Sequence, residues 1–149
     1  MKKKIALGVF ILLIVSWLVW AKSYTFNVEK ATAHLTVHGR NHSRGWCAWY
    51  TMRALQVGGC PAILLPAQWY SWFMPVVGFK EICKNDYKPQ AGDVVVFQKP
   101  KEWKGHLWGH IAMYNGEQWI SDFKQRRMSP YANPKWKIPY KVFRFKRRK

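Results

Sequence analysis

The chain has 149 residues and a formal net charge of +18, from 25 Lys and Arg against 7 Asp and Glu. This length suits one compact domain and is too short for two. So large a positive charge excludes an ordinary neutral surface and predicts an anionic partner: nucleic acid, a phospholipid surface or an acidic cell-wall polymer.

The N-terminus has the pattern of an export segment. Lys2, Lys3 and Lys4 precede an unbroken apolar run over residues 5–21, which is typical of a secretory signal peptide or an N-terminal membrane anchor. The run is at the lower length limit for crossing a bilayer. Val19-Trp20-Ala21 is an imperfect cleavage site for a signal peptide, and the bulky Trp20 in it favours an anchor. We expect residues 22–149 to form an exported, extracytoplasmic or periplasmic domain, which argues against a nucleic acid as partner.

Residues 22–42 are mostly polar and contain several poor helix formers, which predicts an extended or loop conformation. Histidines recur there every four residues, at His34, His38 and His42. On a helix this spacing would align three metal ligands, but a loop would not. We therefore expect no metal site, and nothing in the sequence indicates a cofactor.

The first clear helix is predicted to begin at Ser43, an N-cap residue, and to end at Gly58-Gly59. A short helix is expected around Ala67–Phe73. The C-terminal half predicts an antiparallel sheet, with Asn115-Gly116 as a hairpin signal. The expected strands are Asp93–Gln98, His110–Tyr114, Gln118–Phe123 and Ile138–Phe145. One helix followed by a four-stranded meander is an α+β plan.

Cys47 and His110 are the candidate catalytic pair. Cys47 lies near the start of the predicted helix, where backbone amides favour a thiolate. His110 follows Gly109, which permits close backbone approach, and opens a strand, so its imidazole is well placed to face a cleft and accept the thiol proton. A buried structural thiol is the alternative for Cys47. Three cysteines are an odd number for an exported chain, and one arrangement pairs Cys60 with Cys83.

A third group usually orients a catalytic imidazole, and Asp122 is the candidate. A two-residue turn at Asn115-Gly116 would pair position 110 with 121 and turn Asp122 to the opposite face. A three-residue loop with a bulge would pair 110 with 120 and bring Asp122 onto the same face. The triad therefore predicts the bulged loop. With the tight turn, Gln125 or Ser121 would become the orienting residue.

Four ordered segments give the chain its resemblance to a known family. They are Ser43 with Cys47-Ala48-Trp49-Tyr50, Pro89–Phe97, Gly109–Tyr114 and Trp119–Gln125. Together they resemble the CHAP family, the cysteine- and histidine-dependent amidohydrolases/peptidases. The resemblance implies a papain-like core, in which a helix carrying the cysteine packs on an antiparallel sheet. It also implies Cys47 as nucleophile, His110 as base and acid, and peptidoglycan as substrate. Many members carry an amide two residues after the acid, where this chain has Lys124.

The expected reaction is acyl transfer from a wall-peptide amide to Cys47, which makes the protein a peptidoglycan amidase or endopeptidase. The Cys47 backbone N–H and one further donor would hold the oxyanion. Aromatic side chains would line the cleft, although core packing is expected for at least half of them: Trp46, Trp49, Trp69, Tyr70 and Trp72.

Two other functions are compatible with the composition. The chain could be an inactive relative that binds the wall, or a cationic protein that perturbs membranes. Basic residues gather towards the C-terminus, which predicts either a solvated charge run or a landing surface for peptidoglycan, teichoic acid or anionic lipid. They are Lys124, Arg126, Arg127, Lys135, Lys137, Lys141, Arg144 and Lys146 to Lys149.

Overall fold

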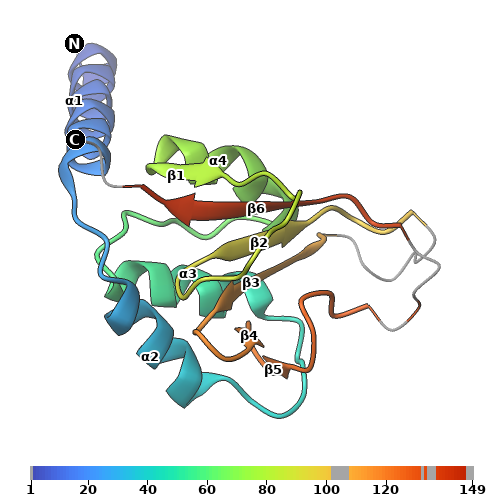
Figure 1. The fold of residues 1–149 in the computed structure, drawn as a ribbon. Helices are drawn as coiled ribbons and strands as arrows, with labels where there is room; N and C mark the ends of the chain where they lie inside the picture. Colours follow the sequence, from blue (N-terminus) through green and yellow to red (C-terminus); the bar gives the residue numbers. More distant parts are fainter. Residues whose placement is uncertain (1, 102–107, 132, 134–136, 147–149) are drawn as a thin grey trace.

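The structure, a computed structural model, describes residues 2–101, 108–131, 133 and 137–146. One six-stranded antiparallel sheet forms its centre, in the strand order β1-β6-β2-β3-β4-β5. The strands are β1 (Phe79–Glu81), β2 (Val94–Phe97), β3 (His110–Tyr114), β4 (Trp119–Ile120), β5 (Lys124–Gln125) and β6 (Tyr140–Phe145). The predicted α+β architecture is confirmed, with helices packed against the sheet (Figure 1).

Successive side chains of a strand point to opposite faces of the sheet. The two faces pack against different parts of the chain. On one face Val94, Val96 and Ile111 pack with residues of the helices. On the other face Val95 and Ala112 pack with aromatic residues of the loops. The helices are α1 (Lys2–Ser23), α2 (Val28–His38), α3 (Cys47–Val57), the 3-10 turn η1 (Ala67–Trp69) and α4 (Tyr70–Val76). The short helix expected around Ala67–Phe73 corresponds to η1 and α4.

The last strand changes the predicted meander. β6 returns to a position next to the edge of the sheet, where it pairs with β1 on one side and with β2 on the other. The strand predicted over 138–145 is therefore present, but it is inserted between two earlier strands. Two strands, β1 and β5, were not predicted, because three and two residues are too few to give a periodic pattern.

The segment 28–38 is a helix, and the prediction that it is extended or a loop is wrong. Asn27 caps it by accepting a hydrogen bond from the backbone of Lys30 at 2.9 Å. Ala31 and Leu35 are buried in the core and hold α2 in place. Tertiary burial thus outweighs the low helix propensity of this segment.

The main helix begins later than predicted. α3 starts at Cys47 with Trp46 as its N-cap residue, and Ser43 lies in the loop before it. The predicted end is confirmed, because the C-cap is Gly58 and the next residue, Gly59, has a positive φ of 92°. Starting the helix at 47 places the thiol at its first residue, closer to the terminal amides than a start at Ser43 would.

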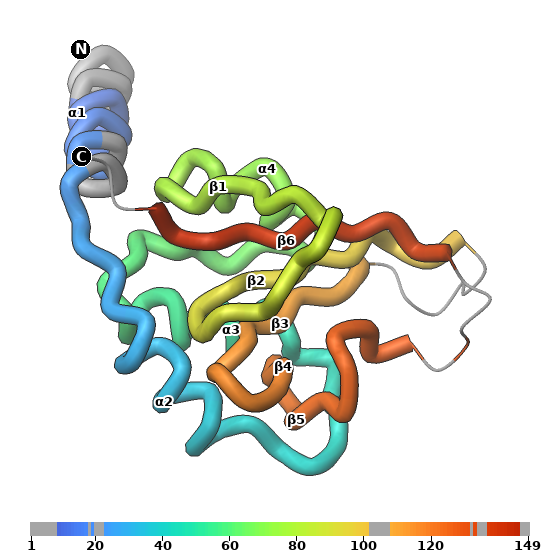
Figure 2. Tube along the Cα trace, viewed as in Figure 1, coloured from blue at the N-terminus to red at the C-terminus, as the bar shows by residue number. Residues whose placement is uncertain are grey.

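The N-terminal segment forms α1, which stands at one edge of the sheet (Figure 1). Trp17 packs on Phe73 of α4, with ring centroids 6.3 Å apart. After α1, Tyr24 packs on Phe145 at 5.4 Å, so the junction of α1 and α2 lies beside the end of β6 (Figure 2). No helix within the described residues is both long and apolar enough to span a membrane.

Candidate active site

Cys47 and His110 line one cleft with a volume of about 570 Å³. Cys47 comes from the start of α3 and His110 from the start of β3, two elements that pack against each other. The remaining walls come from the loop before α3, the segment 64–67 and the residues before β3. These walls are Ser43, Gly45, Trp46, Ala48, Leu64, Leu65, Pro66, Ala67, Trp108 and Gly109.

Opposing effects act on the thiol of Cys47. Burial raises its pKa to about 11, and the charge of Asp122 acts in the same direction. Hydrogen bonds from the backbone N–H groups of Ile111, Ala48 and Cys47 itself lower the pKa by favouring the thiolate. Without a proton acceptor the buried thiol is therefore neutral at pH 7, and these amides are placed to stabilise the anion once a base removes the proton.

His110 is held in a buried position by tight backbone packing. Gly109 has φ +71°, and a Cβ at this residue would lie 2.3 Å from the carbonyl oxygen of Phe97, the strand partner of His110. Only glycine fits such a contact. The predicted close approach at Gly109 is present, and it fixes where β3 begins. The imidazole is 5% exposed and lies among the rings of Phe97, Phe123 and Tyr131.

Gln125 of β5 lies against the imidazole. Its Nε2 is 2.8 Å from Nε2 of His110 and 3.2 Å from Oγ of Ser121. The amide is buried, and among the described residues its Oε1 has no hydrogen-bond partner. Both residues named as alternative orienting groups, Gln125 and Ser121, are thus joined in one buried chain of hydrogen bonds that ends on His110.

Asp122 occupies a different place from the one predicted. Its Oδ2 accepts hydrogen bonds from the loop before α3: from Oγ of Ser43 at 3.0 Å, the N–H of Arg44 at 2.6 Å and the N–H of Trp46 at 3.2 Å. The buried carboxylate therefore caps the start of the helix that carries Cys47. It holds this loop, and the group placed beside the imidazole is Gln125.

The hairpin after β3 explains this difference. Met113 pairs with Ile120 and Tyr114 with Trp119, so the loop is the four-residue segment 115–118. Asn115 Oδ1 stabilises it by accepting hydrogen bonds from the N–H groups of Glu117 and Gln118. Neither the two-residue turn nor the bulged three-residue loop is formed. The prediction of the bulged loop is wrong, and with it the register that would place Asp122 beside His110.

The aromatic side chains are more exposed than predicted. Trp46 lines the cleft, and Trp49, Trp69 and Trp72 are exposed as well. Of the five predicted aromatic residues, Tyr70 alone is buried, and its hydroxyl donates to the carbonyl of Ile63 at 2.7 Å. The expectation that at least half would pack in the core is therefore wrong. Trp108, which the sequence did not single out, also lines the cleft.

The remaining polar candidates do not gather into a further centre. Cys47, Cys60 and Cys83 are free thiols, so the Cys60–Cys83 disulfide is not formed, and Cys60 is buried while Cys83 is exposed. His34 and His38 stack on α2 with ring centroids 4.1 Å apart. Within the described residues no group of three or more His, Cys, Asp and Glu side chains could hold a metal ion.

Part of the C-terminal charge is engaged in contacts within the chain. Arg144 pairs with buried Asp93, Lys141 pairs with Glu81, and Nη2 of Arg127 donates to the carbonyl of Tyr131. Lys135 and residues 147–149 of the predicted charge run lie outside the described residues. The run is therefore neither wholly solvated nor wholly available as a landing surface.

Comparison with known proteins agrees with this geometry. The model of the CHAP domain matches residues 38–122, a segment that contains Cys47, His110 and Asp122. The chain belongs to the CHAP family. Gln125 lies just beyond the segment matched by the CHAP model.

Two solved structures resemble this CHAP domain, both from Ralstonia pickettii. One is a chain of the type VI native effector–immunity complex Tae3–Tai3, with 30% identity, a TM-score of 0.69, and 81% of this chain and 100% of that chain covered. The other comes from the selenomethionine form of the complex, with 32% identity, a TM-score of 0.66, and 78% and 99% covered. No curated protein matched the chain. The likeness agrees with the papain-like plan of helices on an antiparallel sheet.

Proposed function

We propose that the protein hydrolyses amide bonds of peptidoglycan through a thioester on Cys47. The observation that carries this proposal is the convergence of Cys47, at the first residue of α3, and His110, at the first residue of β3, on one cleft. Membership of the CHAP family supports a peptidoglycan amidase or peptidase. The positive charge of the chain agrees with an anionic wall polymer as partner.

The reaction follows from the two side chains. His110 takes the thiol proton, and the thiolate attacks the amide carbonyl to form a tetrahedral oxyanion. The oxyanion collapses as His110 gives the proton to the leaving amine, which leaves an acyl thioester on Cys47. Water, deprotonated by His110, attacks the thioester and releases the carboxylic acid and the free thiol. The backbone N–H of Cys47 is a donor for the oxyanion, because it lies at the start of α3 and is directed at the thiol.

Gln125 determines which nitrogen of His110 acts as the base. If the amide Nε2 donates to Nε2 of the imidazole, the proton of the neutral ring is on Nδ1. If the amide is rotated by half a turn, its Oε1 accepts from Nε2–H and the lone pair is on Nδ1. The second arrangement places the lone pair on Nδ1, which can then take the thiol proton, and the Ser121 hydroxyl would turn to donate to Oε1. We assign this arrangement to the active enzyme, with Gln125 as the positioning residue.

The related complexes suggest where the enzyme acts. The matched chains belong to a type VI effector–immunity complex. From this likeness we propose that the target is extracytoplasmic peptidoglycan and that an immunity-type inhibitor is among the partners of this protein. Residues 1–21 remain our proposed signal or anchor segment, and the apolar side chains of residues 9–15 and of Val19 in α1 are exposed, as such a segment requires. Anionic lipid is a further proposed partner of this segment and of the basic surface.

The test is fragment release from purified peptidoglycan, analysed by mass. Cys47→Ala and His110→Ala should each abolish release while the fold is retained. The double variant should lose little more than either single variant, because the two residues act as one unit. Undiminished release by Cys47→Ala would overturn the proposal and favour a wall-binding protein without catalysis. Leakage from protein-free anionic vesicles would instead favour a membrane-perturbing protein.

A further inference from the structure

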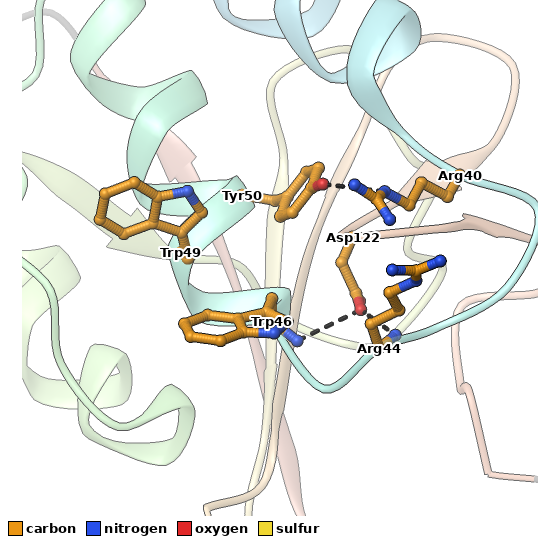
Figure 3. Close-up of a pocket in the computed structure, with 6 residues that line it drawn as sticks. All are labelled: Arg40, Arg44, Trp46, Trp49, Tyr50 and Asp122. Atoms are coloured by element: carbon orange, nitrogen blue, oxygen red, sulfur yellow. Dashed lines mark hydrogen bonds between the residues drawn. The ribbon is translucent and has the colours of Figure 1, made fainter.

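A second hollow lies beside the catalytic cleft. Its volume is about 310 Å³, and its lining consists of Arg40, Arg44, Trp46, Trp49, Tyr50 and Asp122 (Figure 3). Trp46 lines both this hollow and the cleft of Cys47. A ligand that crosses the Trp46 side chain therefore has one part beside the thiol and another in the second hollow.

The hollow carries two guanidinium groups against one carboxylate. Nε of Arg40 donates to Oη of Tyr50 at 3.1 Å, which orients the guanidinium. Its terminal N–H groups are left to bind a ligand. In the described part of the chain, the side chain of Arg44 has no hydrogen bond and neither arginine has an ion-pair partner. The one acid that lines the hollow, Asp122, directs Oδ2 to the loop donors and accepts at Oδ1 from Ser121.

The two arginines are also fixed at their backbones, and Asp122 is the common anchor. The N–H of Arg40 donates to the carbonyl oxygen of Asp122 at 3.0 Å, and the Arg40 carbonyl accepts from Lys124 at 2.8 Å. The N–H of Arg44 donates to Oδ2 of Asp122. Figure 3 shows both guanidinium groups on the side of the hollow opposite Trp49. The backbone from which each guanidinium extends is therefore already ordered before a ligand binds.

We propose that this hollow binds a free carboxylate of the wall peptide whose amide is cleaved at Cys47. Guanidinium groups suit a carboxylate, because their planar N–H donors match its two oxygens. The exposed rings of Trp46 and Trp49 supply flat apolar walls for the neighbouring peptide groups. The site would select peptides by the distance between a carboxylate and the scissile amide. This inference rests on the proposed function, since it assumes that peptide occupies the adjoining cleft.

Binding to the inactive Cys47→Ala protein tests the inference without turnover. The probes are a synthetic muramoyl peptide with free carboxylates and the same peptide with every carboxylate amidated, titrated by calorimetry. We expect the amidated peptide to bind about tenfold more weakly or worse, as the loss of a charged hydrogen-bond partner predicts. Adding Arg40→Gln or Arg44→Gln should reduce affinity for the free peptide by a similar factor and leave affinity for the amidated peptide unchanged.

Arg53→Gln is the matched control, because Arg53 is an exposed arginine of α3 that lines neither hollow. It should preserve the discrimination between the two peptides. Discrimination that survives in both Arg40→Gln and Arg44→Gln would overturn the inference, and so would an equal loss of affinity for both peptides. Inorganic phosphate that binds at these arginines while the two peptides bind alike would identify a phosphate site and also overturn it. Wild-type hydrolysis without any preference for the free peptide would contradict this inference alone, whereas carboxylate-selective binding without hydrolysis would contradict the proposed function alone.

Discussion

Nε2 of His110 lies 2.8 Å from the side-chain amide of Gln125, on a strand that starts only four residues after β4 ends. The chain bends between the two strands, at Ser121–Phe123, and then pairs back on β4. Because of this bend, the side chains of Asp122 and Gln125 contact different parts of the site. The Asp122 carboxylate holds the loop before Cys47, and the Gln125 amide holds the imidazole.

Gln125→Ala should lower kcat by on the order of 10²-fold, because an imidazole that is free to rotate loses the near-attack geometry. The KM for peptidoglycan fragments should change little, since Gln125 does not line the cleft. Gln125→Glu should retain much of the activity and move the acid limb of the kcat profile upward, because a carboxylate beside the imidazole stabilises its protonated form. The measurement is the pH dependence of kcat for the two variants. Equal kcat in wild type and Gln125→Ala would show that the amide has no positioning role.

Asp122→Ala should destabilise the protein by about 2–4 kcal/mol, because three loop donors lose a charged acceptor. Urea unfolding measures this loss. Activity should fall as well, since the start of α3 carries Cys47. Asp122→Asn, which keeps one acceptor oxygen, should lose less stability.

The pH profile separates this role from that of a triad acid. Because the Asp122 carboxylate is engaged with the loop, Asp122→Asn should move the pH at which kcat rises much less than Gln125→Glu does, although loss of its charge should lower the pKa of the Cys47 thiol. A shift of that midpoint by about one unit in Asp122→Asn would instead support a direct contact between Asp122 and His110.

The sequence was sufficient to place the elements that carry the candidate catalytic pair. Strand β3 begins at His110 as predicted. Gly109 ends the preceding loop, has a positive φ and lies against the backbone of Phe97, and the residues after His110 are apolar ones typical of a core. The α+β class follows from β-branched and apolar runs with clear boundaries. These are local signals, and each is strong within fewer than ten residues.

The predictions that failed depend on contacts between distant segments. Residues 28–38 form a helix because Leu35 is buried in the core, which their own propensities do not indicate. The orienting group depended on the register after Tyr114, and that register is set by the Asn115 side chain in a four-residue loop. Gln125 is an alternative orienting residue in the sequence, but no local pattern ranks it above Asp122, because both are polar residues within four positions of each other.

The thiol of Cys47 should show a pH dependence that reveals its partner. Burial raises its pKa to about 11, so without a neighbouring cation only on the order of one thiol in 10⁴ is ionised at pH 7. In His110→Ala the rate of alkylation by iodoacetamide should therefore rise about tenfold per pH unit up to pH 10. In the parent protein the imidazolium of His110 should stabilise the thiolate, so that alkylation becomes measurable at a lower pH.

A Cys83→Ser background is needed for this measurement, since Cys83 is exposed and would react as well. Cys60 is buried and should react slowly, which mass analysis of the labelled peptides can verify. Coincident alkylation curves with and without His110 would contradict the proposed thiol–imidazole pair.

Arg144→Met should destabilise the fold by about 3–5 kcal/mol, because it leaves the carboxylate of Asp93 buried without its cation. Asp93 is fully buried, and Arg144 donates to both of its oxygens, from Nε at 2.7 Å and from Nη2 at 2.8 Å. Lys141→Met is the control on the same strand, since its pair with Glu81 is about half exposed and should contribute only about 0–1 kcal/mol. Urea unfolding of the two variants measures the difference. Similar losses in both would mean that the buried pair adds no more than a surface pair. Neither Asp93 nor Arg144 lines the catalytic cleft, so folded Arg144→Met should cleave peptidoglycan at the parent rate.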